Sequence, residues 1–384
     1  MPNIYKMILD EAKRRNIIYY EKYFPFYVSS LGCHVFNQLN EEREIYTEGG
    51  VVPNTRLHIL MVAFPGFGKS YFLKQQLYSK SYSLYQDSGI RCGFKSGKMT
   101  EAGFIGSVDT DEDGKPVMQY GLCHESREGK SILGIEEFSA VTNSFKQDYN
   151  VGLDTAMLTA LDSGDVGKDL KGGSMTYHTQ LTLWAGVQPA RYDLSSGFSR
   201  RFIFMAFYPT LKDIQYFRNK RREAKGIKTH ITALKNIRLS LRQRTAEIKQ
   251  NLKNVVIGQD FYAFINKFDQ MHYDDELCER VGIGYWLMRS EHIQDQLIVR
   301  MEPELKRILL LLKDYEHTVR NTSPTTIVWK LISEENKIQK GTILNYASRL
   351  GLHNSEIQGA LSTLSRKKYI HVDGFNVEII KKVS

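Results

Sequence analysis

Cysteine is scarce in this sequence, and the few that occur lack a framework spacing. The four cysteines among 384 residues, Cys33, Cys92, Cys123 and Cys278, show no CxxC pattern, so we predict neither a zinc site nor a disulfide framework. No run of about 18 apolar residues occurs, as a membrane-spanning helix would require. The first residues also lack the apolar core of a signal peptide. We therefore expect a cytoplasmic protein without a membrane partner.

Tandem repeats and low-complexity segments are missing as well. A hydrophobic content of 42% with 11% aromatic residues indicates globular structure, and the length suffices for two or three domains. The formal net charge of +9 is compatible with nucleic acid as a partner. A solvated basic face would give the same net charge, so charge alone does not identify the partner.

What the sequence does contain is a glycine-rich loop that ends in lysine and serine, Ala63–Ser70. The apolar run Leu57–Val62 precedes it and predicts a buried parallel strand, and Tyr71–Leu77 follows with helical periodicity. Strand, glycine-rich loop and helix form the context of a phosphate-binding P-loop. The residues expected to bind the nucleotide here are Pro65, Gly66, Phe67, Gly68, Lys69, Ser70 and Tyr71.

Each part of this loop has a chemical role. Gly66 and Gly68 allow backbone N–H groups to turn toward an anion, and the helix N-terminus adds the positive end of its dipole. Lys69 is expected to reach the β- and γ-phosphates, and the Ser70 hydroxyl to hold Mg²⁺. A glycine-rich turn with a capping serine is the alternative interpretation, which Gly-Lys-Ser in this context disfavours. We predict an ATP or GTP site with Mg²⁺.

An apolar strand that ends in two acids predicts the second half of such a site. Lys130–Ile135 runs directly into Glu136 and Glu137. The first acid would position Mg²⁺, and the second would orient and deprotonate the attacking water. Glutamate at position 136 has a longer arm than the aspartate usual there, so its metal contact is expected to be weaker or displaced. A further strand, Gln180–Gly186, would deliver Gln188 beside the phosphates.

Two hairpins are predicted between these strands. The Asp113-Gly114 pair predicts the turn of the first. The second is expected within Asp165–Thr182, with Lys168 and Lys171 near its tip, after a helix predicted from Asp154 to Leu161.

The remaining sections read as mostly helical. Residues 1–50 predict either a helical collar on the nucleotide domain or a subunit contact. Residues 211–253 are unusually basic with helical apolar spacing, for which a solvated helix face is favoured over a nucleic-acid surface. Residues 255–317 are predicted to be mainly helical. Beyond Pro324, three helices and two strands around an Asp373-Gly374 turn predict a winged-helix domain.

These patterns together resemble AAA+ ATPases and, among them, the minichromosome maintenance (MCM) helicase branch, over about residues 50–317. Lys98–Ile105 resembles the family's segment leading into its helix-2 insert, and Gly129–Phe138 its run into the acidic strand end. Val166–Leu183 resembles the pre-sensor hairpin, so Lys168 or Lys171 would correspond to a DNA-contacting lysine. Ala185–Pro189 resembles the sensor-1 segment, with glutamine where the family has asparagine.

Arginines extend the resemblance. Ser199–Phe202 resembles the arginine-finger segment, in which either Arg200 or Arg201 would be the finger. Arg300 would bind the nucleotide from a sensor-2 helix that Pro303 interrupts.

The resemblance implies an α/β fold: an AAA+ P-loop parallel-sheet domain with a helical lid, followed by a C-terminal winged-helix domain. It implies a hexameric homo-oligomer that binds ATP and Mg²⁺ between subunits, in a reduced form without the family's large N-terminal domain. The divisions expected are an N-terminal helical segment (1–50), an AAA+ nucleotide-binding core (51–210), a helical lid (211–320) and the winged helix (321–384).

The activity implied is that of a DNA-dependent ATPase, an MCM-like replicative helicase or DNA remodeller of plasmid or viral type. Its catalytic residues would be Glu137, Gln188 and one of the two arginines. Two alternatives stay open. One is a protein-remodelling ATPase of the MoxR or chelatase type, which shares similar inserts, and the other is an ATP-switched loader or regulator bound to DNA.

Overall fold

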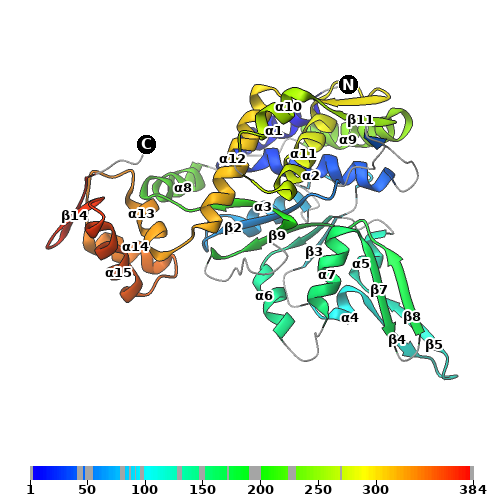
Figure 1. Ribbon diagram of the computed structural model, residues 1–384, viewed down its shortest axis with the longest axis horizontal. Helices are drawn as coiled ribbons and strands as arrows, with labels where there is room; N and C mark the ends of the chain where they lie inside the picture. Colours follow the sequence, from blue (N-terminus) through cyan, green and yellow to red (C-terminus); the bar gives the residue numbers. More distant parts are fainter. Residues whose placement is uncertain are drawn as a thin grey trace.

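The computed structural model has a central sheet with helices, two hairpins that extend from one side, and a small C-terminal unit at the other end (Figure 1). No helix among the described residues is long and apolar enough to cross a membrane. The structure describes residues 3–40, 46–47, 55–77, 83–85, 88–90, 92–95, 99–127, 132–146, 152–170, 173–189, 200–223, 231–268 and 270–380.

A five-stranded, wholly parallel sheet lies at the centre. Its strand order is β10-β2-β9-β6-β3, so β9 lies between β2 and β6. Every residue of β2, β6, β9 and β10 is buried, as expected for strands covered on both faces. The predicted α/β class with a parallel sheet is confirmed. The strands are β2 (His58–Ala63), β3 (Cys92–Lys95), β6 (Ile132–Ile135), β9 (Thr182–Val187) and β10 (Phe202–Phe207).

The N-terminal segment is helical, as predicted, and its second helix packs on the central sheet. It contains α1 (Ile4–Arg14) and α2 (Tyr20–Asn40). The indole of Trp184 on β9 donates a 2.8 Å hydrogen bond to the Ser30 hydroxyl on α2. The ring of Tyr27, also on α2, meets the same indole edge-on with centroids 4.8 Å apart. These contacts fix α2 against the sheet.

On its other side α2 meets α11 (His272–Arg289) at two glycines. A Cβ on Gly32 would lie 2.3 Å from the Gly284 carbonyl oxygen, and a Cβ on Gly284 would lie 1.9 Å from the Ser29 carbonyl oxygen. Only glycine permits the two backbones to approach this closely.

The region predicted as a mainly helical lid contributes two strands to a second sheet, and the third comes from the N-terminal segment. The parallel strands are β1 (Tyr46–Thr47), β11 (Asn254–Ile257) and β12 (Gln296–Val299), in the order β1-β11-β12. Apolar runs this short have no period that distinguishes strand from helix, which explains the error. The helices of the region are α8 (Leu211–Glu223), α9 (Ile231–Asn251), α10 (Gln259–Ile265), α11 and α12 (Pro303–Arg320).

Both predicted hairpins are confirmed, and they pack against each other. The Tyr177 hydroxyl of the second donates a 2.7 Å hydrogen bond to the Ile105 carbonyl at the base of the first. The rings of Tyr120 and Tyr177 are also in edge-on contact. The first hairpin is β4 (Gly106–Thr110) with β5 (Pro116–Tyr120), the second is β7 (Asp165–Leu170) with β8 (Gly173–His178), and the nearby helices are α4 (Glu101–Phe104), α5 (Leu122–Arg127), α6 (Phe138–Thr142) and α7 (Leu153–Asp162).

The C-terminal unit has the three predicted helices and the two predicted final strands around the Asp373-Gly374 turn. A short strand that was not predicted, β13, completes an antiparallel sheet in the order β13-β15-β14. The Thr322 hydroxyl before this unit lies 2.5 Å from the Tyr208 hydroxyl, directly after β10. The elements are α13 (Pro324–Ile332), β13 (Lys337–Gln339), α14 (Lys340–Arg349), α15 (Asn354–Arg366), β14 (Ile370–Asp373) and β15 (Asn376–Ile379).

Candidate nucleotide site

The glycine-rich loop connects β2 to α3 (Lys69–Leu77), as its sequence predicts. Gly66 and Gly68 have φ values of +83° and +88°, in the left-handed region that glycine adopts at no steric cost. At Gly66 a Cβ would meet nothing within 4 Å, so conformation and not space requires glycine there. The amide of Phe72 donates to the Gly68 carbonyl at 2.8 Å and continues the helix from the loop.

One cleft of about 460 Å³ collects most of the predicted nucleotide-binding and catalytic residues. The sheet order explains the convergence. Because β9 lies between β2 and β6, three neighbouring carboxyl ends deliver the loop, the two acids and Gln188 to one edge. The lining residues are Pro65, Gly66, Gly68, Lys69, Ser70, Glu136, Glu137 and Gln188.

Lys69 is largely buried at the floor of this loop. Its ammonium donates to the carbonyl of Ala63 at 2.6 Å and to that of Phe64 at 3.4 Å. A phosphate is a stronger acceptor for an ammonium than a neutral carbonyl is. The lysine is therefore able to exchange these carbonyls for phosphate oxygens in the same cleft.

The Glu137 carboxylate is held at both oxygens. The Ser139 hydroxyl donates to Oε1 at 2.6 Å, and the Gln188 amide donates to Oε2 at 3.3 Å. Ser139 was not singled out from the sequence, since a serine two residues after an acid has no distinctive pattern. Within the described residues, no group of three or more His, Cys, Asp or Glu could hold a metal ion alone. A Mg²⁺ ion would need phosphate and water oxygens beside Ser70 and Glu136.

The two arginines before β10 have different environments. Arg201 is buried, and its guanidinium donates to the Leu158 carbonyl at 3.1 Å and to Asp162 Oδ2 at 2.8 Å. Burial lowers the pKa of Arg201, and the Asp162 charge opposes that shift. Arg200 lies 3.8 Å from the same carboxylate, but 56% of its side chain is exposed. Arg201 therefore anchors β10 to α7, and Arg200 is the one accessible to another molecule.

The prediction that Arg300 lies in a helix is wrong. Arg300 follows β12, and Pro303 does not interrupt a helix but begins α12, because proline suits the first helical position. The opposite end of α12 is the one near the cleft, since Thr322 contacts Tyr208 and the Tyr208 ring packs on Phe64. An 18-residue helix is about 27 Å long, which separates Arg300 from that end.

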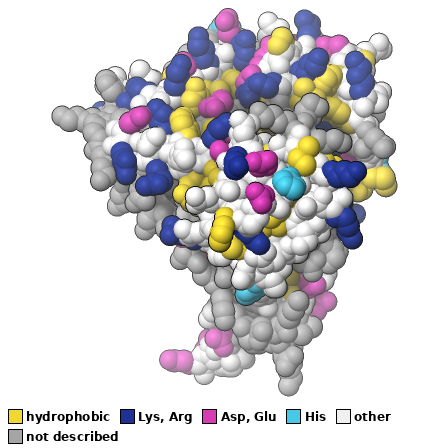
Figure 2. All heavy atoms as spheres, turned by 90° about the vertical axis from the view of Figure 1, so that its left-hand side faces the viewer, with side chains coloured by type: hydrophobic (Ala, Val, Ile, Leu, Met, Phe, Trp, Pro, Cys, Tyr) yellow, Lys and Arg dark blue, Asp and Glu magenta, His cyan; other side chains and the backbone are white. Residues whose placement is uncertain are grey.

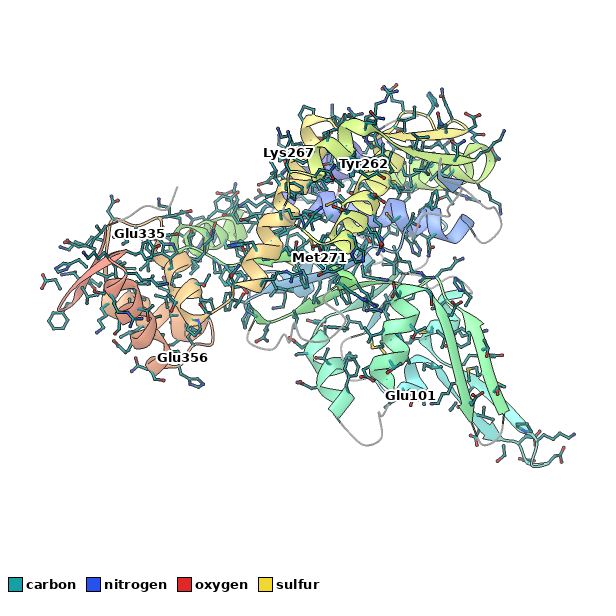
Figure 3. All side chains as sticks on the ribbon, viewed as in Figure 1. Glu101, Tyr262, Lys267, Met271, Glu335 and Glu356 are labelled. Carbon is teal, nitrogen blue, oxygen red and sulfur yellow. The ribbon has the colours of Figure 1, made fainter. Side chains whose placement is uncertain are left out.

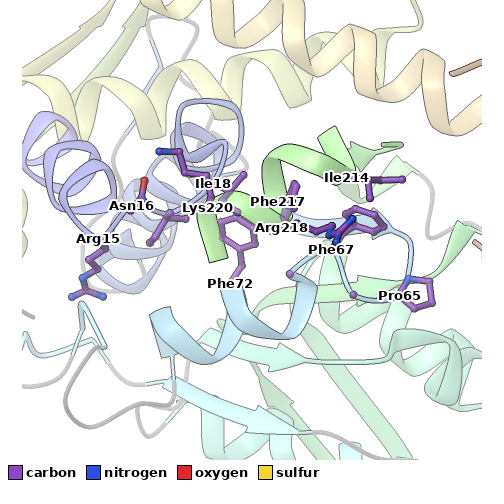
Figure 4. Close-up of a pocket in the computed structure, with 13 residues that line it drawn as sticks. Arg15, Asn16, Ile18, Pro65, Phe67, Phe72, Ile214, Phe217, Arg218 and Lys220 are labelled. Carbon is purple, nitrogen blue, oxygen red and sulfur yellow. The ribbon is translucent and has the colours of Figure 1, made fainter. Parts of the chain in front are cut away.

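A second, more apolar cavity of about 570 Å³ adjoins the same loop, and it was missed from the sequence. It shares Pro65, Gly66 and Gly68 with the cleft, so the two spaces adjoin along the loop. Figure 4 shows its walls: the turn between α1 and α2 with Asn16 and Ile18, the loop and α3 with Phe67 and Phe72, and α8 with Ile214, Phe217 and Arg218. The volume is within the range of small-molecule sites.

The spacing of three residues on α8 could have indicated this cavity from the sequence. Ile214, Phe217 and Arg218 are separated by three and four positions, so they share a helix face. The ring of Phe217 packs edge-on against Phe67, with centroids 5.4 Å apart. The predicted nucleotide residue Phe67 thus lines this cavity, whereas the side chain of Tyr71 lies outside what the structure describes.

Lys168 lies in β7 opposite Met175, two residue pairs before the last pair of the hairpin, Leu170 with Gly173. Its ammonium is 3.1 Å from a carboxylate oxygen of Glu101 on α4, the residue labelled in Figure 3, so it is paired within the fold. Both side chains of this pair are only 19% exposed. Lys171 lies outside the described residues.

The described residues of the two hairpins are acidic overall. The first hairpin presents Asp111, Glu112 and Asp113 at its tip. Among the described residues of both hairpins, six acids accompany two lysines, and one of those lysines is the paired Lys168. On the face of the molecule that includes the C-terminal unit, basic side chains are interspersed with acidic ones (Figure 2).

Comparison with known proteins adds no family to this description. No protein-family model matches the chain, and no curated protein matches it significantly.

Proposed function

We propose that this chain is a Mg²⁺-dependent ATPase of the AAA+ type. The observation that carries the proposal is the cleft, in which Lys69, Ser70, Glu136, Glu137 and Gln188 line one space beside a turned glycine-rich loop. A lysine, a hydroxyl, two carboxylates and an amide are the groups that phosphoryl transfer to water requires.

The adjoining cavity is the candidate for the base and ribose, since the phosphates would lie across the shared loop. No carboxylate is among the described residues that line it. A carboxylate is the acceptor that suits the N1–H and 2-amino donors of guanine, so its absence from this lining favours adenine. Phe67 and Phe217 offer apolar surface to the base.

In the proposed reaction Lys69 binds the β- and γ-phosphates, and Ser70 and Glu136 would hold Mg²⁺, which would supply positive charge against the charge of the phosphates. Glu137 takes the proton of the attacking water, which Gln188 orients. Charge that develops on the γ-phosphate needs a further cation, and we assign this role to Arg200 of a neighbouring copy in a hexameric ring. The exposure of Arg200 supports that choice over the buried Arg201.

The proposed partner is DNA, and the proposed role is that of a replicative helicase or DNA remodeller. The net charge of +9 and the C-terminal unit support it, since three helices with an antiparallel sheet are the elements of a winged-helix domain. Winged helices also bind proteins, so this part depends on the resemblance to the MCM branch.

The acidic hairpins favour a second candidate, a protein-remodelling ATPase. Phosphate backbones are bound by lysine and arginine, whereas the tip of the first hairpin carries three acids in succession. Single-stranded DNA should stimulate hydrolysis if DNA is the partner. Stimulation by a basic polypeptide, with no response to DNA, would favour the second candidate.

Two substitutions test the ATPase itself. Lys69→Ala should abolish nucleotide binding, and Glu137→Gln should retain ATP but lower hydrolysis by about a hundredfold or more. Binding is measured with a fluorescent ATP analogue and hydrolysis by phosphate release. Lys267→Ala is the matched control, because Lys267 is exposed just after α10 and does not line the cleft (Figure 3). Hydrolysis at the parental rate by Glu137→Gln would refute the role given to that carboxylate.

A further inference from the structure

The Glu137 carboxylate has two contacts of unequal quality. Ser139 lies in the first turn of α6, is 1% exposed, and donates to Oε1 at 2.6 Å. Its neighbours in the chain, Phe138 and Val141, are fully buried in the core, so the hydroxyl has a fixed position. A short hydrogen bond to a carboxylate is strong where water cannot compete for it.

The contact from Gln188 differs in length and in exposure to ligand. Its amide is 3.3 Å from Oε2, near the upper limit for a hydrogen bond, and it lines the cleft. Water or a phosphate oxygen in the cleft can therefore replace this contact. Ser139 is not among the described residues that line the cleft, so a ligand there does not reach it.

We propose that Ser139 is a positioning residue that holds Oε1 of Glu137 and so presents Oε2 to the attacking water. The inference rests on the proposed ATPase. In the step that it serves, the water oxygen bonds to the γ-phosphorus as the bond to the β–γ bridging oxygen breaks. The bridging oxygen leaves with ADP and keeps the electron pair, and the water proton passes to Oε2. Ser139 touches neither water nor nucleotide, so it acts only through Glu137.

The test is a set of steady-state and binding measurements on the full chain. Ser139→Ala should lower kcat about tenfold, with the dissociation constant for the ATP analogue unchanged within about twofold. Ser139→Thr retains the hydroxyl and should recover most of kcat. Thr142→Val is the matched control on the same helix, since the Thr142 hydroxyl donates to the Ser139 carbonyl, at 3.3 Å, and to no other group among the described residues.

A double substitution separates positioning from damage to the fold. In the Glu137→Gln background no carboxylate base remains to be positioned, so adding Ser139→Ala should lower the residual rate by less than about twofold. An equal loss in both backgrounds would overturn the inference, and so would an unchanged kcat in Ser139→Ala alone. A wild-type chain that hydrolyses no nucleotide would instead overturn the proposed function and this inference with it.

Discussion

The cleft beside the glycine-rich loop and the pair of hairpins differ in how their charged residues are placed. In the cleft, Lys69, Glu136 and Glu137 all line one space. In the hairpins, Lys168 is paired with Glu101 inside the fold, and the exposed tip of the first hairpin is acidic. Charged residues thus converge on a ligand space in one region and serve the fold or face solvent in the other.

The two regions differ because short local motifs specify the residues of the cleft, whereas residues distant in the sequence determine the surroundings of a hairpin. The loop and the acids are short motifs at the carboxyl ends of parallel strands, and parallel strands bring those ends to one edge. The surface of a hairpin depends on what packs beside each strand, and Glu101 is 67 positions away from Lys168 in the sequence. Local motifs are therefore safer predictors of a site than the basic residues of an insert.

The largest effect is expected at Arg200 and Arg201. The sequence motif does not say which of them is the finger, whereas their burial distinguishes the exposed Arg200 from the buried Arg201. Arg200→Ala should assemble and bind ATP normally, yet hydrolyse it about a thousandfold more slowly, because the neighbouring site loses its cation. Arg201→Ala should instead lower the free energy of unfolding by about 2 kcal/mol, less than for a fully buried pair because Asp162 is half exposed. Phosphate release and urea denaturation measure the two effects.

The control for a site shared between subunits is to mix two inactive variants. The Glu137→Gln variant supplies Arg200 and the Arg200→Ala variant supplies Glu137, so mixed assemblies should recover part of the ATPase activity. Arg200→Lys keeps the charge but not the planar fork, and should be intermediate. Full activity of Arg200→Ala, or hydrolysis by an isolated wild-type monomer at the rate of the assembly, would contradict a finger in trans.

Much of the fold was predictable because its signals are local. The loop between β2 and α3, the acids after β6 and the Asp113-Gly114 turn are each specified within a few residues. The second sheet was missed because β1, β11 and β12 have only two to four residues each. Arg300 was assigned to a helix because Pro303 was interpreted as an interruption and not as a helix start.

The apolar cavity could not be predicted as a unit, because its walls come from three distant stretches. Packing of α2 on the sheet and of α8 beside the loop brings together three residues that line the cavity, Asn16, Phe67 and Phe217. The sequence also could not distinguish Arg200 from Arg201 as the finger, because the difference in their burial depends on contact with Asp162 of α7. The cavity and the environments of the two arginines both depend on long-range packing.

The cavity allows the two halves of the proposed nucleotide site to be tested separately. Phe217→Ala should weaken ATP binding by about tenfold to a hundredfold, the usual value of stacking between a base and an aromatic ring. Tripolyphosphate occupies only the cleft, so its affinity should not change. Isothermal titration calorimetry measures both ligands.

Tyr216→Ala is the matched control for that experiment, since Tyr216 is an exposed aromatic on the same helix and does not line the cavity. If Phe217→Ala and Tyr216→Ala weakened ATP equally, or if tripolyphosphate lost affinity as well, the cavity would not be the nucleoside site.

The smallest effect is expected at the hairpin tip, where we propose that DNA makes no contact. Glu112→Gln with Asp113→Asn removes two negative charges and keeps Asp111, whose carboxylate accepts hydrogen bonds from the turn amides of Asp113 and Lys115. The affinity for single-stranded DNA should then change by less than about twofold at about 0.1 M salt and above, because charges outside the interface are screened there within about 10 Å.

Arg366→Ala, an exposed position at the end of α15, is the comparison for that experiment. If the C-terminal unit binds the DNA backbone, this change should reduce the slope of log affinity against log salt by about one. Fluorescence anisotropy over a salt titration measures both variants. A severalfold gain in affinity for the hairpin variant at low salt, fading as salt rises, would instead put the DNA path along the hairpins. The acidic tip would then weaken binding there, and the contrast between the cleft and the hairpins would no longer hold.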